Sequence, residues 1–167
     1  MVTGDLFRKY PTPKHFAEAN QAELEQDIRP TGFFRMKTKS IIGSSKALVE
    51  KYGGRVPKEI EDLVQLPGVG RKTANVVLGQ AYGIISGVVV DTHVSRLSQR
   101  LGFTNADDPE KIEQDLMQIF QKKDWIAVGS VLILHGRRTC HARYPKCPEC
   151  SVNGLCPSAD LFVKQTK

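Results

Sequence analysis

All four cysteines of this 167-residue chain lie close together, in the order Cys140-x6-Cys147-x2-Cys150-x5-Cys156. Four thiolates at this spacing can surround one metal centre, and such a centre would hold a loop-rich tail in a single conformation. A disulfide framework usually needs an oxidising compartment and more widely spread cysteines, and no signal-like apolar run follows the first residue. The spacing therefore predicts a metal site with all four cysteines as ligands.

The spacing leaves the metal itself open. Structural zinc sites commonly use two C-x2-4-C pairs, whereas this chain has only the pair Cys147 and Cys150. Iron–sulfur clusters bind four cysteine thiolates with unequal gaps between them. Tetrahedral thiolate sites suit either metal, so zinc and an iron–sulfur cluster remain alternatives from the residues alone.

A second candidate site is the segment LPGVGRKT at residues 66–73, which joins two stretches of helical periodicity. Pro67 ends the first stretch, and Gly68 and Gly70 permit positive φ and close approach of a ligand to the backbone. The next helix begins at once, so its unpaired N–H groups and positive dipole end face the turn. Such a turn suits an anion, and phosphate is the natural candidate.

Three interpretations of this turn compete. It is a tight connector that needs glycine only for its geometry, a nucleotide-binding P-loop, or a helix–hairpin–helix that grips a nucleic-acid backbone. A P-loop requires G-x4-G-K-[ST] after a strand, whereas Lys72 is two residues past Gly70 and a helix precedes the turn. The P-loop is therefore excluded. A net charge of +6 and a pI near 9.2 favour a polyanionic partner and hence the helix–hairpin–helix.

Apolar periodicity predicts an all-α fold around these sites. The predicted helices cover residues 13–28, 35–52, 57–65, 71–82, 91–101, 108–121 and 124–138. Asp91 and Asp108 stand at N-cap positions, and Gly53 follows the second helix. The run Val88–Val90 is too short to indicate a sheet, and no run approaches the ~18 apolar residues of a membrane span.

The chain resembles the endonuclease III family of DNA glycosylases in four segments that follow the family's order. They are LPGVGRKTANVVL at 66–78, VDTHV at 90–94, LHGR at 134–137 and the cysteine tail. The resemblance implies a helix–hairpin–helix DNA glycosylase fold with two helical lobes. Residues 1–84 would form a helical-barrel lobe that contains the hairpin at 57–82. Residues 85–167 would form an iron–sulfur lobe with its cluster loop at 140–156.

The resemblance also implies the cofactor and the reaction. The four cysteines would hold a [4Fe-4S] cluster rather than zinc. The enzyme would remove oxidised pyrimidines from duplex DNA and cleave the strand 3′ to the abasic site by β-elimination. The expected partner is double-stranded DNA with damaged bases or abasic sites, and no membrane partner is expected. The protein would act as a monomer in the bacterial cytoplasm.

Lys72 is the residue to which the resemblance assigns the covalent step. Its amine would attack the sugar C1′, expel the base and form a Schiff base. This chemistry requires a neutral amine, yet an ordinary lysine with a pKa of about 10.4 is neutral in only about one molecule in a thousand at physiological pH. A helix N-terminus contributes too little, about 0.3–1 kcal/mol. Desolvation by the extruded nucleotide would therefore have to supply most of the activation.

Asp91 has two interpretations. Its position before a helical run is typical of an N-cap, and the resemblance makes it the partner of Lys72. A nearby carboxylate would raise the pKa of a lysine, so its useful role is to accept a proton or to stabilise positive charge on the sugar. One carboxylate could serve both purposes.

The remaining predicted site residues contact DNA. They are Gly68, Val69, Gly70, Arg71 and Thr73 in the turn, and Arg137, Arg143 and Lys146 near the cysteines. No acidic residue occurs from Trp125 to Pro148, so this stretch predicts a phosphate-binding surface. His93 and His135 are interpreted as hydrogen-bonded structural residues.

The sequence departs from the family at its start. The family's N-terminal helix and the segment after it, which supplies a glutamine near the extruded nucleotide, have no counterpart here. We therefore expect an N-terminally shortened chain with uncovered apolar faces. The alternative function is a non-catalytic, metal-stabilised module that binds duplex DNA without cleaving it.

Overall fold

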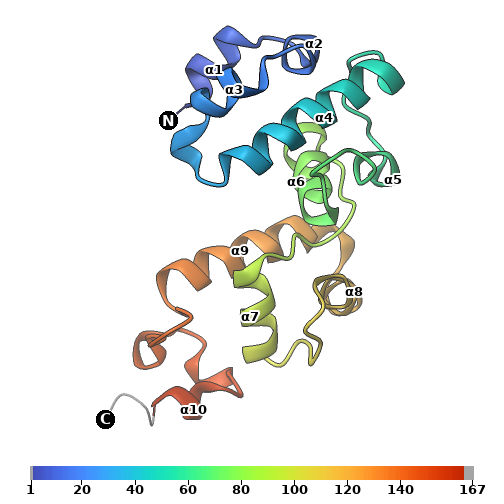
Figure 1. The fold of residues 1–167 in the computed structure, drawn as a ribbon. Coiled ribbons are helices and arrows are strands. Elements are labelled where there is room, and N and C mark those ends of the chain that lie inside the picture. The colour runs from blue at the N-terminus through green and yellow to red at the C-terminus, as the bar shows by residue number, and fades with distance from the viewer. Residues whose placement is uncertain (1, 164–167) are drawn as a thin grey trace. The chain divides into compact units, whose positions relative to one another are not determined.

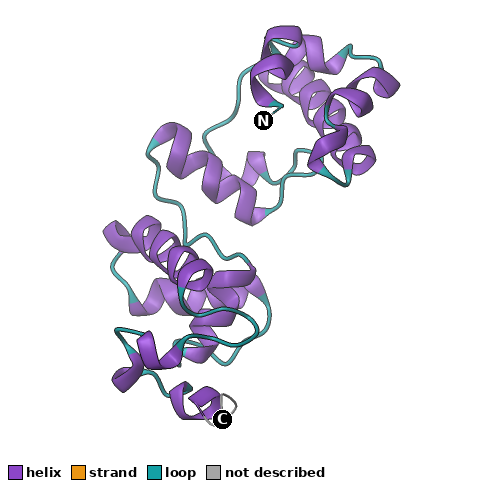
Figure 2. Cartoon of the chain, turned by 90° about the vertical axis from the view of Figure 1, so that its left-hand side faces the viewer, coloured by secondary structure: helices purple, strands orange, loops and turns teal. Residues whose placement is uncertain are grey.

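The computed structural model describes residues 2–163, which consist of helices and connecting loops without a strand (Figures 1 and 2). The predicted all-α class is confirmed. The chain divides into two compact units, one up to Ala74 and one from Asn75 onward. This division falls inside a helix, whereas the lobe boundary expected between residues 84 and 85 stays a prediction.

The first unit contains the helices before the turn. They are α1 (Thr3–Lys9), α2 (Pro13–Ala17), α3 (Gln21–Asp27), the 3-10 helix η1 (Arg29–Thr31), α4 (Phe34–Tyr52) and α5 (Ile60–Leu63). Helix α6 (Arg71–Tyr82) then crosses from the first unit into the second.

Two predicted helices of this unit differ from the structure. The range 13–28 is two helices, because Asn20 has an extended conformation and its side chain accepts a hydrogen bond from the amide of Glu23 at the start of α3. The range 57–65 shortens to α5. Helix α1, which was not predicted, packs Leu6 onto the buried residues Tyr10 and Leu24.

The end of α4 follows the predicted signal. Gly53 has φ +58°, and the amide of Gly54 donates to the carbonyl of Leu48 at 2.8 Å. A glycine in the left-handed conformation ends helices in this way because it satisfies the last carbonyls without steric cost.

The second unit surrounds its own apolar core. Its elements are α7 (Thr92–Arg100), α8 (Pro109–Ile119), η2 (Lys122–Asp124), α9 (Trp125–Arg138), η3 (Cys147–Glu149), η4 (Asn153–Leu155) and α10 (Ala159–Val163). Val94 and Leu97 of α7 meet Leu116 of α8 and Leu132 of α9 in this core. Asp91 and Asp108 cap α7 and α8 as predicted.

No helix in the described part of the chain is both long enough and apolar enough to cross a membrane.

A buried phenol in the first unit makes its stability sensitive to alkaline pH. Tyr10 donates to Oδ2 of Asp27 at 3.0 Å, and Lys9 Nζ contacts the same oxygen at 2.8 Å. Burial and the hydrogen bond to Asp27 raise the pKa of Tyr10 above its usual 10.0. Folding therefore favours the protonated phenol, and its contribution is present below pH 10.0 and is lost as pH rises through the higher folded-state pKa.

We expect Tyr10→Phe to lower the free energy of unfolding by about 1–2 kcal/mol at neutral pH. The difference from wild type should shrink at strongly alkaline pH. Urea unfolding of both proteins across this range measures it. A difference that stays constant with pH would contradict the role of the phenol proton.

Candidate functional site

The turn at residues 66–70 is held from inside and exposed at its tip. Leu63 and Leu66 are buried, and the amide of Val69 donates to the carbonyl of Leu66 at 3.0 Å. Gly68 and Gly70 are exposed to solvent, and α6 begins at the next residue. Backbone amides at the start of α6 are therefore accessible, as the predicted phosphate-binding turn requires.

Helix α4 explains the glycine at position 68. Gly68 has φ +78°, and a Cβ at this position would overlap the side chain of Ser40 on α4. Pro67 lies against Gly43 of the same helix, with 3.1 Å separating the Pro67 Cβ from a Cβ placed on Gly43. Gly70 does not use the positive φ that it permits, and a Cβ there would meet open space.

The polar residues after the turn lie in the first turn of α6. Lys72 and Thr73 are exposed, Arg71 is partly buried, and the first turn of α6 contains no acidic residue. Lys72 belongs to the first unit and Asp91 to the second. Their expected pairing therefore stays a prediction.

Asp91 is fixed as the N-cap of α7. Its Oδ1 accepts hydrogen bonds from the amides of His93 at 2.8 Å and Val94 at 2.9 Å. The residue is partly buried. The capping interpretation is confirmed, and both amides donate to the same carboxylate oxygen, which leaves Oδ2 for a second role.

A buried hydrogen-bond chain holds the segment that leads to Asp91. Asn75 Nδ2 donates to Oε1 of Glu113 at 2.8 Å, and the Ser86 hydroxyl donates to Oδ1 of Asn75 at 2.7 Å. Asn75 and Glu113 are both buried. A Cβ at Gly87 would overlap the Glu113 carboxylate, so only glycine fits there. Sequence reasoning missed this network, because no sequence pattern pairs Asn75 of the segment 66–78 with Glu113.

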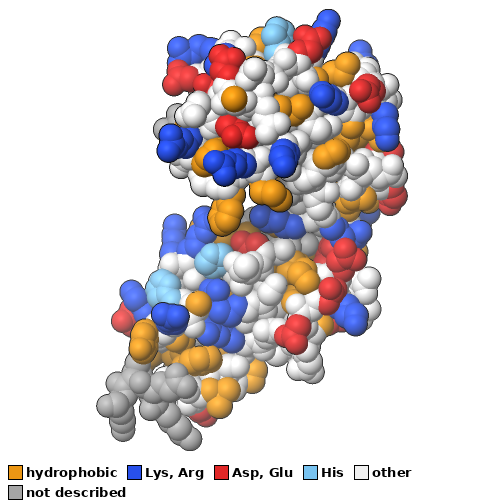
Figure 3. Space-filling model, in the orientation of Figure 1, with side chains coloured by type: hydrophobic (Ala, Val, Ile, Leu, Met, Phe, Trp, Pro, Cys, Tyr) orange, Lys and Arg blue, Asp and Glu red, His pale blue; other side chains and the backbone are white. Residues whose placement is uncertain are grey.

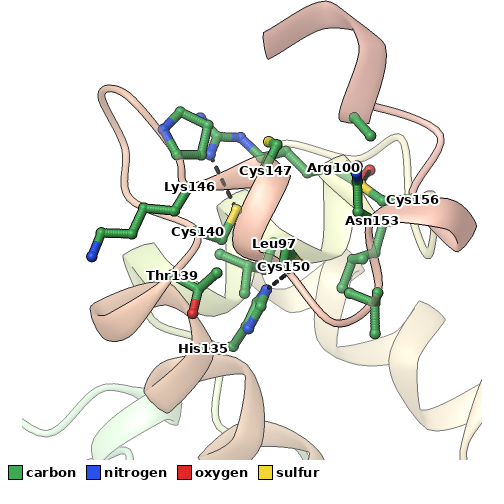
Figure 4. Close-up of a pocket in the computed structure, with 14 residues that line it drawn as sticks. Leu97, Arg100, His135, Thr139, Cys140, Lys146, Cys147, Cys150, Asn153 and Cys156 are labelled. Carbon is green, nitrogen blue, oxygen red and sulfur yellow. Dashed lines mark hydrogen bonds between the residues drawn. The ribbon is translucent and has the colours of Figure 1, made fainter. Parts of the chain in front are cut away.

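The four cysteines line one cavity in the second unit, which we call the thiol cavity (Figure 4). All four are free, partly buried thiols. Burial and the three neighbouring thiols raise the pKa of Cys147, and the charge of Arg100 acts in the opposite direction.

Nitrogen atoms from two helices contact the sulfurs. Arg100 Nη1 of α7 donates to Cys140 Sγ at 3.2 Å, and His135 Nε2 of α9 lies 3.6 Å from Cys150 Sγ (Figure 4). His135 thus has a hydrogen-bonding role, as interpreted. Sequence reasoning missed Arg100. Its place in the last turn of the helix that Asp91 caps was the one available signal that it lies far from Asp91 and near another part of the chain.

The donor set suits a soft metal centre, because four thiols share a partly desolvated cavity with a cationic hydrogen-bond donor. Within residues 2–163, no three His, Cys, Asp or Glu side chains are grouped so as to hold a single metal ion. The ligand roles of the cysteines stay a prediction.

A basic surface lies beside the thiol cavity. Lys and Arg side chains gather over the end of α9 and the loop after it (Figure 3). Arg137, Arg138, Arg143 and Lys146 are all exposed. The Lys146 side chain points away from the cysteines, toward solvent (Figure 4). These residues form the surface on which the sequence predicts phosphate contacts.

Comparison with known proteins places this fold and site in a class. The model for HhH-GPD superfamily base excision DNA repair proteins matches residues 1–122. The endonuclease III of Synechocystis sp. is 52% identical over 158 residues, which cover 95% of this chain and 72% of that protein.

Two solved structures resemble this one with a TM-score of 0.91. A non-covalent endonuclease III–DNA complex is 43% identical over 98% of this chain and 76% of that one. A trapped endonuclease III–DNA covalent intermediate is 42% identical over 99% and 76%. The chain therefore belongs to the HhH-GPD superfamily of base excision DNA repair proteins and, within it, to the endonuclease III family.

The two glycines of the turn provide a matched test of its geometry. We expect Gly68→Ala to lower the free energy of unfolding by about 2–4 kcal/mol, because the new Cβ meets positive φ and the Ser40 side chain. Gly70→Ala should cost less than about 1 kcal/mol. Urea unfolding measures both, and equal losses would contradict the assigned packing.

Proposed function

We propose that this chain is a bifunctional base-excision enzyme that removes oxidised pyrimidines from duplex DNA and then cleaves the strand at the abasic site. The observation that carries the proposal is the exposed Lys72 amine in the first turn of α6, directly after a turn of exposed backbone. A family member trapped as a covalent DNA intermediate supports a covalent step.

The turn and the basic surface bind the DNA backbone. The turn residues Gly68, Val69 and Gly70 contact the DNA backbone together with the side chains of Arg71 and Thr73. In the second unit, Arg137, Arg143 and Lys146 contact further phosphates. Contacts of this kind position the duplex without reading its sequence, so recognition of the lesion depends on extruding the damaged nucleotide.

The covalent step begins when the neutral Lys72 amine attacks C1′ of the extruded nucleotide. A nitrogen–carbon bond forms as the bond from C1′ to the base breaks, and the base leaves with that electron pair and takes a proton from water. The attached nitrogen gives a proton to the Asp91 carboxylate, and the ring oxygen takes this proton as its bond to C1′ breaks, which leaves a Schiff base. Removal of a C2′ proton then expels the 3′ phosphate, and water releases the enzyme from the product.

Solvent must leave before this step occurs. An exposed lysine is protonated at neutral pH, and only loss of water around the amine favours its neutral form strongly enough. Closure of the protein around the extruded nucleotide provides this desolvation. Reactivity is thereby confined to bound substrate.

Asp91 is the proposed proton acceptor and electrostatic partner. Its Oδ1 is occupied by two amides of α7, which fixes the orientation of the carboxylate. Oδ2 then faces the reacting sugar and stabilises its developing positive charge or accepts a proton.

The proposed cofactor is a [4Fe-4S] cluster held by Cys140, Cys147, Cys150 and Cys156, with zinc as the alternative. When bound, it would stabilise the loop structurally. Residues 141–146 then present Arg143 and Lys146 to DNA. The bacterial source of the relative supports the expected cytoplasmic location.

The role of Lys72 can be tested by borohydride trapping on abasic or thymine-glycol DNA. We expect wild type to form a covalent complex and Lys72→Ala to form none, because alanine lacks the primary amine that forms the Schiff base. Lys46→Ala removes an exposed lysine of α4 and is the matched control. Trapping that survives Lys72→Ala would refute the assignment. Salt-sensitive binding without cleavage of any lesion would favour the non-catalytic module.

The two roles of Asp91 separate in two variants. Asp91→Asn keeps an oxygen that accepts from the α7 amides, so stability should change by less than about 0.5 kcal/mol. Loss of the carboxylate should lower single-turnover base removal roughly 10²–10⁴-fold. Asp91→Ala should lose activity and also about 1 kcal/mol of stability. Full activity in Asp91→Asn would leave Asp91 as a cap alone.

A further inference from the structure

The Arg100 side chain, at the end of α7, makes several contacts to the loop that carries the cysteines. Its Nη1 donates to Cys140 Sγ at 3.2 Å and to the carbonyl of His141 at 2.8 Å. Its Nη2 donates to the carbonyl of Ala142 at 3.0 Å. One planar guanidinium thus spans three consecutive residues, a geometry that lysine cannot reproduce.

The same residue also reaches the other end of the loop. Its backbone carbonyl accepts a hydrogen bond from Cys156 Sγ at 3.5 Å. Its guanidinium lies over the ring of Phe162 on α10, 4.3 Å from the centroid. Arg100 therefore contacts the first and the last cysteine and the helix that follows them.

The charge of Arg100 matters for the sulfur that it contacts. A hydrogen bond from a cation to a thiolate withdraws electron density and is stronger than a neutral hydrogen bond. Hydrogen bonds to cluster sulfurs are among the features that set the reduction potential of an iron–sulfur cluster. His135, beside Cys150, is a donor in only one of its neutral tautomers, whereas Arg100 is always a donor.

We propose that Arg100 is a positioning residue that keeps Cys140 in its ligand geometry and makes the reduction potential of the cluster less negative. The reduced cluster carries one more negative charge than the oxidised cluster, so a fixed cation beside its ligand favours the reduced form. This inference rests on the proposed cluster. It adds a named residue that couples α7, and hence the helix that Asp91 caps, to the properties of the metal centre.

Arg96 provides a matched control one turn earlier on α7. Its Nη2 donates to the carbonyl of Cys140 at 2.9 Å and to the carbonyl of Gly136 at 3.3 Å. Both arginines therefore hold the same part of the loop, but Arg96 donates to carbonyls and contacts His93, whereas Arg100 contacts a sulfur. A purely structural role for Arg100 would make the two residues equivalent.

The experiment compares wild type with Arg100→Gln, Arg100→Lys, Arg96→Gln and Arg96→Lys as full chains. Iron, sulfide and zinc are counted per chain, and voltammetry measures the potential of each loaded protein, with the electrode as the source of the single electron. We expect Arg100→Gln to shift the oxidised-to-reduced equilibrium about tenfold toward the oxidised form, about 59 mV for a one-electron couple. The Arg96 variants should keep the wild-type potential.

The outcomes separate the two claims. Zinc without iron in wild type would overturn the proposed cluster, and this inference with it. A loaded Arg100→Gln with unchanged potential would overturn the inference and leave the cluster in place. If Arg100→Gln binds no iron, Arg100→Lys decides, because lysine keeps the charge but cannot hold it at the Cys140 sulfur in the fixed geometry of a guanidinium. A lowered potential in Arg100→Lys then supports the inference, and an unchanged one overturns it. If both Arg100 variants lose iron and both Arg96 variants keep it, the result supports the inference, because only the arginine that contacts the sulfur is then needed. If all four variants lose iron, the inference is overturned, because the two arginines are then equivalent.

Discussion

Helix α7 is the element on which the chemistry of the second unit depends. Its first amides hold the Asp91 carboxylate, and its last turn carries Arg100 to the sulfur of Cys140. Between these ends, Val94 and Leu97 are fully buried in the core. Close packing prevents a buried helix from rotating or sliding without opening voids. The Asp91 carboxylate and the Arg100 guanidinium therefore keep fixed places at the two ends of one rigid helix.

The turn at residues 66–70 depends instead on a position where only glycine, which has no side chain, fits well. Gly68 combines positive φ with contact to Ser40, so any larger residue would push the turn away from α4. With Leu63 and Leu66 buried beneath it, the turn presents bare backbone at its tip. An anion can then approach the first amides of α6, and Lys72 is exposed in the same helical turn.

Local signals predicted much of the fold. The caps at Asp91 and Asp108 and the left-handed Gly53 marked helix ends correctly, because each satisfies backbone groups of its own helix. The break at Asn20 was missed, since apolar periodicity continues across it while the chain changes direction. The two glycines of the turn could not be told apart from the sequence, because a glycine permits positive φ without requiring it, and only Gly68 adopts it.

The sequence by itself determined which groups are available for chemistry: four cysteines at fixed spacing, a lysine after a glycine turn, and an aspartate at a helix start. These are properties of short segments, so they can be read without coordinates. Only the tertiary structure decided which groups surround them. Arg100 meets Cys140 and Asn75 meets Glu113 across about forty residues of chain. Such contacts arise from the packing of helices, and the short-range patterns of a single sequence do not encode them.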